Sequence, residues 1–153
     1  IGEHDGIDLV TVSYAYRTEV CEPTAKGLYG SYCGKGTNGA DTEAGRAIAS
    51  ARSTEAYQRA VAGRDAIVGI CITDGDFNHD VIAQVRTHMA SNASCERWCG
   101  IVVDPKELPR RKQAMQNAFG EDNVTTATTA DACAPEIART VQKAIQFAEA
   151  RRG

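Results

Sequence analysis

The chain has 153 residues, enough for one domain whose core needs no disulfide or metal to hold it together. Hydrophobic residues make up 42% and charged residues 24%, which argues against a disordered chain, a collagen or a coiled coil. The 17 Lys and Arg are outnumbered by 20 Asp and Glu, so the composition predicts no general nucleic-acid binding. No apolar run approaches the roughly 18 residues of a membrane span.

The first predicted element is a strand over Asp8–Tyr16, where β-branched and aromatic residues partly alternate with polar ones. The next segment, Arg17–Gly39, contains too many glycines for a helix interior and is predicted to be a loop. An Ala-rich segment follows, and it predicts one helix from Thr42, near its N-cap, to about Val61.

The segment Asp65–Thr73 is an almost continuous apolar run without alternation. It predicts a central strand buried on both faces of a parallel sheet, so that Ile72→Asp would unfold the domain. The remaining predicted elements are a helix over Asn78–Met89, a strand over Arg97–Val103, a helix over Lys106–Phe119, a strand over Asn123–Thr128 and a helix over Ala134–Arg151. This alternation predicts a single α/β domain over residues 1–153, with a doubly wound, mainly parallel sheet and helices on both faces.

The six cysteines form no Cys-x-x-Cys pair, which argues against a zinc site. Cys71 lies within an apolar run and is predicted to be a core residue. Cys21 and Cys33 flank the Gly-rich loop and would pair in an oxidising compartment. Glycosylation sequons at Asn92 and Asn123 point the same way. An extracellular or luminal location and a cytoplasmic one both remain open.

Ligands of parallel sheets bind at the carboxyl ends of the strands, so the residues there are the candidates for function. Asp74 directly follows the apolar strand, Gly75 turns the chain, and Asp76 comes next. A carboxylate in that position suits a hard cation, although Asp74 would equally cap the turn or the next helix. Thr42, which opens a helix after a Gly-rich loop, is either an oxygen ligand or a plain N-cap.

Together these segments resemble the von Willebrand factor A domain, over most of Asp8–Arg152. The shared features are a Gly-rich loop, a Thr that opens a helix, about thirty intervening residues and an apolar strand ending in Thr-Asp-Gly. The resemblance implies a metal-ion-dependent adhesion site in which Mg²⁺ accepts an acidic group from a partner protein. Its ligands would be Thr42 and Asp74, with Asp76 nearby.

The sequence departs from the family in one respect, because it lacks the Asp-x-Ser-x-Ser segment that ends the family's first strand. The corresponding positions at the end of the predicted first strand and just beyond it hold Ser13, Ala15 and Arg17. Either the chain lacks the N-terminal strand and helix of the family, or it is a degenerate relative. The favoured function is a protein-binding or adhesion module, dependent on a divalent cation, rather than an enzyme.

Two other functions remain open for the same residues. The Asp-Gly-Asp sequence resembles that of metal-dependent phosphohydrolases and phosphotransferases, with Asp74 as nucleophile and Asp76 as general acid, although Phe77 replaces the usual Thr. The other alternative is a structural subunit whose site has decayed. An EF-hand is rejected, because His79 and Val85 occupy the positions that need Gly and Glu.

Overall fold

The computed structural model describes residues 10–14, 18–21 and 44–152, which form an α/β fold. The strands are β1 (Thr11–Tyr14), β2 (Thr18–Cys21), β3 (Ile67–Thr73), β4 (Glu96–Val103) and β5 (Val124–Ala127). The helices are α2 (Ala44–Arg52), α3 (Glu55–Gly63), α4 (His79–Ala90), α5 (Pro109–Phe119), the short 3-10 helix η1 (Glu121–Asn123) and α6 (Ala130–Arg152). From β3 to α6, strands and helices alternate as the sequence predicts.

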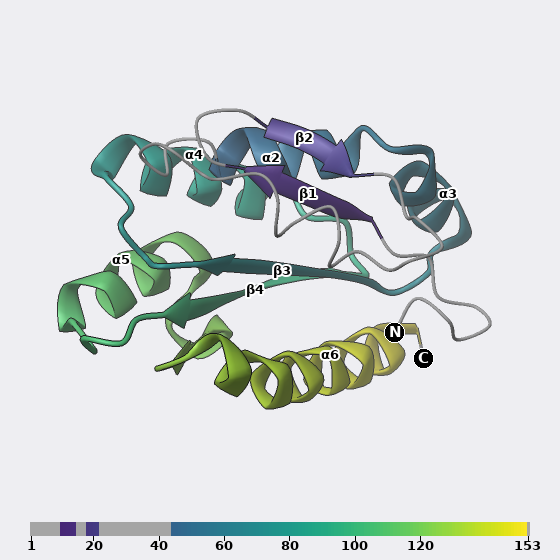
Figure 1. Ribbon diagram of the computed structural model, residues 1–153. Helices are drawn as coiled ribbons and strands as arrows, with labels where there is room; N and C mark the ends of the chain where they lie inside the picture. Colours follow the sequence, from purple (N-terminus) through teal and green to yellow (C-terminus); the bar gives the residue numbers. More distant parts are fainter. Residues whose placement is uncertain (1–9, 15–17, 22–43, 153) are drawn as a thin grey trace.

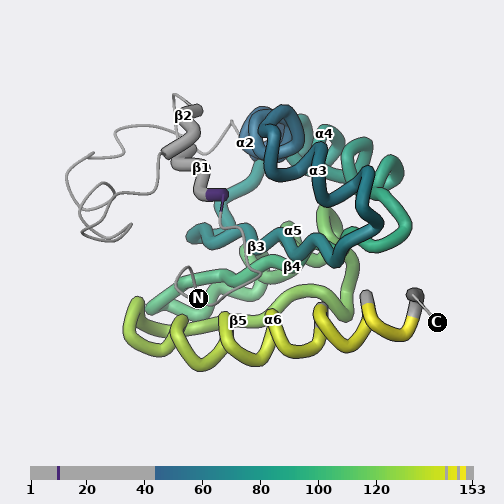
Figure 2. The backbone as a smooth tube through the Cα atoms, turned by 90° about the vertical axis from the view of Figure 1, so that its right-hand side faces the viewer, coloured from purple at the N-terminus to yellow at the C-terminus, as the bar shows by residue number. Residues whose placement is uncertain are grey.

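The three strands β3, β4 and β5 form a parallel sheet in that order, and β1 pairs with β2 in a separate antiparallel hairpin. Figure 1 and Figure 2 show α4 and α5 on one side of the parallel sheet and α6 on the other. The chain passes from β3 to β4 through α4 and from β4 to β5 through α5, moving across the sheet in the same direction each time. Because such crossovers are right-handed, both connecting helices lie on the same face. Among the described residues, helices therefore cover both faces of the sheet.

Two apolar clusters, one on each face, hold these layers together. The larger cluster joins α4 and α5 to the sheet through fully buried side chains such as Val85, Met115 and Val102. The smaller cluster joins the sheet to α6 through Ile101 and Cys133. Val102 and Ile101 are neighbours in β4 and face opposite ways, because side chains alternate along a strand. β4 is thus the strand that is buried on both faces.

The position of β3 differs from the prediction, because β3 is an edge strand of the described sheet rather than its centre. Ile72 is 44% exposed, so the burial on which the prediction for Ile72→Asp rested is absent. Cys71, next to it, is buried in the core as expected. An unbroken apolar run indicates that both faces of a strand are apolar. It does not show whether the strand pairs with one neighbouring strand or with two.

The predicted helix from Thr42 to about Val61 is two helices in the described part, α2 and α3, with a break at Ser53 and Thr54. The Thr54 hydroxyl accepts a hydrogen bond from the Tyr57 amide and caps α3. Hydroxyl side chains compete with the helical backbone in this way, and Ala-rich periodicity alone does not reveal the break. Strand β2 falls in a segment predicted to be a loop, so that part of the prediction is also wrong.

A close approach between strands β3 and β4 explains one glycine. A Cβ on Gly69 would lie 2.1 Å from Cδ2 of Trp98, its partner in the sheet register, so the indole ring occupies the space of the missing side chain. The indole Nε1 then donates a hydrogen bond to Glu96 at 2.6 Å. The Trp98 side chain thereby connects β3 to the amino end of β4.

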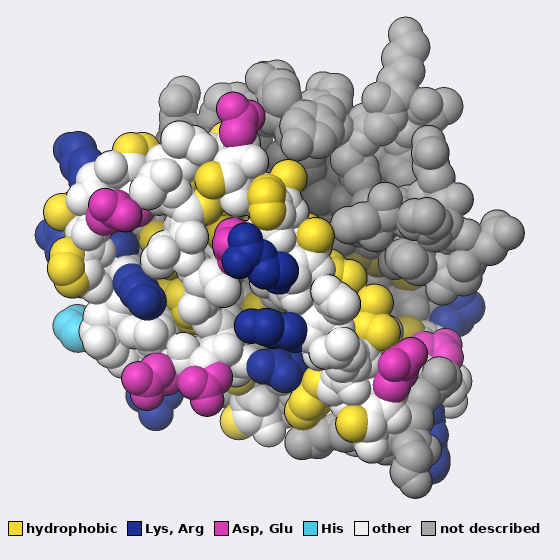
Figure 3. All heavy atoms as spheres, turned by 90° about the horizontal axis from the view of Figure 1, so that it is seen from below, with side chains coloured by type: hydrophobic (Ala, Val, Ile, Leu, Met, Phe, Trp, Pro, Cys, Tyr) yellow, Lys and Arg dark blue, Asp and Glu magenta, His cyan; other side chains and the backbone are white. Residues whose placement is uncertain are grey.

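The outer face of α6 is charged. Viewed from below in Figure 3, Lys and Arg side chains gather near the centre of this face, and Asp and Glu side chains lie around them. The helix is also held by Arg97 of β4, whose guanidinium lies 5.0 Å from the centre of the Phe147 ring. None of the described helices, α6 included, combines the length and the hydropathy that a membrane crossing requires.

Candidate functional site

The predicted site residues Asp74 and Asp76 lie on a tight turn at the carboxyl end of β3. The Asp74 Oδ1 accepts a hydrogen bond from the Asp76 amide at 3.0 Å, and the Thr73 hydroxyl accepts one from the Gly75 amide at 3.2 Å. The Phe77 amide donates to the Gly75 carbonyl at 2.9 Å, and its side chain is buried in the core. Hydrogen bonds within the turn thus define its shape, while Asp74 and Asp76 are exposed.

Gly75 fixes the position of this turn against α5. It has a φ of +81°, which side-chain-bearing residues rarely adopt. A Cβ at this position would also lie 3.0 Å from Val102 Cγ1 and from both Cβ and the carbonyl oxygen of Arg111. Only glycine meets both requirements, so the turn is seated on the start of α5.

The structure brings two of the three predicted metal ligands together, because Asp74 and Asp76 share one turn. Thr42 lies outside the described residues, and so does the expectation that its hydroxyl lies within about 6 Å of Asp74. Within the described ranges, no group of three or more His, Cys, Asp or Glu side chains is arranged to hold a metal ion.

A second carboxylate, Asp104, follows the carboxyl end of β4, at the same end of the parallel strands as Asp74. The Asp104 side chain is buried. Its oxygens accept hydrogen bonds from the amides of Leu108 at 2.6 Å and Lys106 at 3.1 Å, and from the Arg111 guanidinium at 3.2 Å. Burial alone would raise the pKa of Asp104, but these hydrogen bonds and the positive charge of Arg111 outweigh it and lower the pKa below its usual value. Asp104 thus organises the turn that leads into α5.

This turn explains why α5 begins later than predicted. The predicted helix began at Lys106, whereas α5 begins at Pro109. The amides of Lys106 and Leu108 bond to the Asp104 carboxylate instead of continuing a helix, and Glu107 between them has a φ of +51°. The fixed φ of proline suits the first position of a helix, so Pro109 marks the start.

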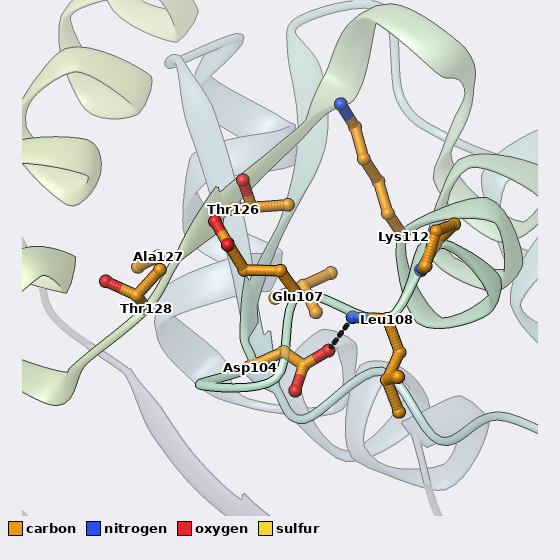
Figure 4. Close-up of a pocket in the computed structure, with 9 residues that line it drawn as sticks. Asp104, Glu107, Leu108, Lys112, Thr126, Ala127 and Thr128 are labelled. Atoms are coloured by element: carbon orange, nitrogen blue, oxygen red, sulfur yellow. Dashed lines mark hydrogen bonds between the residues drawn. The ribbon is translucent and has the colours of Figure 1, made fainter.

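A pocket of about 220 Å³ opens beside this turn, between the start of α5 and the end of β5 (Figure 4). Its lining residues are Val102, Asp104, Glu107, Leu108, Pro109, Lys112, Thr126, Ala127 and Thr128. The side chains of Glu107 and Lys112 extend toward the side of the pocket on which Thr126 lies (Figure 4). The pocket therefore combines both signs of charge, hydroxyl groups and an apolar floor.

Neither the role of Asp104 nor the pocket was predicted from the sequence. The available signal was the one that singled out Asp74, namely an Asp directly after an apolar strand. The basic run from Lys106 to Lys112 in the sequence is typical of a solvated helix face, with an acidic partner surface as the alternative. Lys106, Arg110 and Lys112 are exposed as expected, whereas Arg111 is partly buried against Asp104.

The amino end of the parallel strands contains a buried hydrogen-bond network around Glu96, the first residue of β4. Its Oε1 accepts hydrogen bonds from Arg52 at 2.9 Å and Trp98 at 2.6 Å, and its Oε2 accepts from the Tyr57 hydroxyl at 2.7 Å and the Ala93 amide at 2.9 Å. Burial would raise the pKa of Glu96, but the donors outweigh it and lower the pKa. Burial and the hydrogen bond to Glu96 raise the pKa of Tyr57 to about 12. Because every partner is internal, this network is structural.

The two sequons of the sequence analysis also fall on structural residues. The Asn123 amide group, where a glycan would attach, donates a hydrogen bond to the Phe119 carbonyl at 2.8 Å. Its Oδ1 accepts from Arg97 at 2.8 Å. The Asn92 side chain accepts a hydrogen bond from Arg52 in the network around Glu96. Both asparagines thus serve the fold, and the sequons are weak support for an extracellular location.

Comparison of the chain with protein-family models, with curated proteins and with solved structures gave no match. The resemblance to the von Willebrand factor A domain therefore stays a prediction from the sequence.

Proposed function

We propose that the chain is a protein-binding module of the von Willebrand factor A type, with the doubly wound sheet of that family. It binds through the turn at the carboxyl end of β3. Asp74 and Asp76, with Thr42, hold a Mg²⁺ ion that accepts an acidic group from the partner protein.

The observation that carries this proposal is the close packing of the Asp74–Asp76 turn against α5 and β4. Gly75 packs against Arg111 and Val102, so the exposed carboxylates of Asp74 and Asp76 are presented from a rigid support. A binding site gains affinity when its side chains are already ordered before the partner binds, because less conformational entropy is then lost on binding. Rigid display at a strand end is what a recognition surface requires.

The chemistry of the donors suits Mg²⁺ better than Ca²⁺. Mg²⁺ usually keeps several waters and binds one or two protein carboxylates, whereas Ca²⁺ takes six to eight oxygen ligands. The described residues supply two carboxylates on this turn, Asp74 and Asp76. A Mg²⁺ ion bound by these groups would retain exchangeable waters, and a carboxylate of the partner would replace one of them.

The first test is metal binding by the isolated chain, with Mn²⁺ as a paramagnetic substitute for Mg²⁺. Mn²⁺ at low concentration should broaden the amide NMR signals of Gly75, Asp76 and Phe77, and excess Mg²⁺ should reverse the effect. Asp74→Asn and Asp76→Asn should each remove it. Asp80→Asn is the matched control, because Asp80 is an exposed carboxylate in the first turn of α4. Broadening that is absent, or that is lost equally in Asp80→Asn, would contradict the proposal.

The second test separates binding from catalysis. On an array of acidic peptides, the chain should retain ligands in Mg²⁺ and release them in EDTA, and Asp74→Ala should bind none while remaining folded. The alternative phosphotransferase would hydrolyse a generic aryl phosphate in Mg²⁺, with Asp74 as nucleophile. We expect no hydrolysis. Turnover that disappears in Asp74→Asn would overturn the binding function and favour the enzyme.

A further inference from the structure

The pocket beside α5 presents two opposite charges that do not neutralise each other. Glu107 and Lys112 both line it and both are exposed. Neither forms an ion pair within 4.0 Å among the described residues, although both side chains extend toward the same side of the pocket (Figure 4). A ligand with a single charge would be attracted by one of these groups and repelled by the other.

The pocket has an apolar lining, and the buried charge in it is paired within the protein. Its accessible apolar lining is Leu108, which is half-buried, and Pro109, which is exposed, while Val102 and Ala127 are buried behind it. Asp104 also lines the floor, but its charge is matched by Arg111 and by hydrogen bonds from two backbone amides. Asp104 therefore does not compete with Glu107 for a positively charged group.

Glu107 is held in a strained conformation. Its φ of +51° belongs to the left-handed region, which is unfavourable for a residue with a side chain. The strain persists because the Glu107 amide donates to the Asp104 carbonyl at 3.1 Å and the amides on both sides donate to the Asp104 carboxylate. Strained residues of this kind concentrate at functional sites. Here the strain directs a carboxylate to the rim of the pocket.

We propose that this pocket binds a free α-amino acid with a short apolar side chain. The carboxylate of the ligand faces Lys112, its ammonium group faces Glu107, and its side chain lies on Leu108 and Pro109. The hydroxyls of Thr126 and Thr128 line the same pocket and are available to the polar end. A volume of about 220 Å³ is below the roughly 300 Å³ at which pockets for larger ligands begin, so the ligand has few atoms. This inference does not depend on the metal site at Asp74.

The test is an NMR titration of the chain with three matched probes: L-valine, N-acetyl-L-valine and L-valinamide. N-acetylvaline lacks the ammonium group and valinamide lacks the carboxylate. Because both rim charges are exposed, we expect weak binding of valine, with a Kd on the order of 1 mM, read from the amide signals of Thr126 to Thr128. Each modified probe should bind about three- to tenfold more weakly than valine.

Two isosteric variants assign each charge to one end of the ligand. In Glu107→Gln, valine and N-acetylvaline should bind equally, because the partner of the ammonium group is gone. In Lys112→Gln, the advantage of valine over valinamide should disappear. Arg110→Gln is the control, because Arg110 is an exposed cation of the same helical turn that does not line the pocket, and all preferences should persist.

Three outcomes would overturn the proposal: no saturable shift with valine, equal binding of the three probes by the unaltered chain, or an effect of Arg110→Gln as large as that of Lys112→Gln. None of them bears on Mn²⁺ binding at Asp74. The two proposals can therefore fail separately.

Discussion

Two buried carboxylates, Glu96 and Asp104, mark the opposite ends of β4, and they are stabilised in different ways. The partners of Glu96 include Arg52 and Tyr57, which are 44 and 39 residues away in the sequence. The partners of Asp104 lie within seven residues of it. Glu96 therefore joins distant segments of the fold, whereas Asp104 shapes one turn. The amino end of the sheet supports the fold, and the carboxyl end is arranged to present groups to solvent.

The two carboxylates also respond to acid in the same direction. Each has a pKa below its ordinary value, so the stability it adds is present at neutral pH and is lost as the pH falls. The loss begins near the ordinary pKa of 4.5 for Glu96 and of 3.8 for Asp104. As the pH falls, the stability added by Glu96 should therefore begin to decline at a higher pH than that added by Asp104.

The largest effect is expected for Glu96→Gln. The change removes the charge that balances Arg52, whose side chain is 14% exposed, and leaves at least one of the four donors around position 96 without its acceptor. Breaking one partner of a buried ion pair typically costs about 3 kcal/mol or more. Urea denaturation should show this loss in the free energy of unfolding.

The control for this experiment is Glu55→Gln, because the Glu55 side chain is 96% exposed and pairs with Arg59 only at the surface. It should change the free energy of unfolding by less than about 0.5 kcal/mol. Equal losses in Glu96→Gln and Glu55→Gln would mean that the network around Glu96 does not stabilise the fold.

A smaller and more local effect is expected for Asp104→Asn. An asparagine retains one acceptor oxygen but loses the charge that pairs with Arg111. Hydrogen exchange should quicken at the amides of Lys106 and Leu108, while the protected amides of β4 should keep their rates. Faster exchange throughout β4 would show instead that Asp104 supports the whole sheet, as Glu96 does.

The smallest effect concerns His88, which lies near the network at the amino end. Burial, and then the positive charge of Arg52, lower its pKa below 6.5. The unfolded chain then binds a proton at a higher pH than the folded chain does, so stability falls as the pH drops below 6.5. Thermal unfolding measured between pH 7 and pH 5 should show a shallow decline, and His88→Gln should flatten it. An unchanged slope would assign the decline to another group.

The local periodicity of the sequence determined most of the element types. The apolar spacing of α4, the apolar residues of β4 and the β-branched residues of β5 predicted these elements within a few residues of their ends. The start of α6 was predicted at Ala134, yet the helix begins at Ala130. The Thr129 hydroxyl accepts a hydrogen bond from the Ala132 amide there. Capping by one side chain moved this boundary by a full turn.

The sequence also singled out the turn at Asp74, because a carboxylate after an apolar strand is a local pattern. Only the tertiary structure decided that β3 is an edge strand of the described sheet, that Glu96 collects donors from α2 and α3, and that Glu107 and Lys112 line one pocket. These features depend on contacts between segments far apart in the chain, or on a backbone turn shaped by one buried carboxylate. The spacing of residues along the sequence does not give the distance between such groups in space. Only the folded structure shows which of them lie close together.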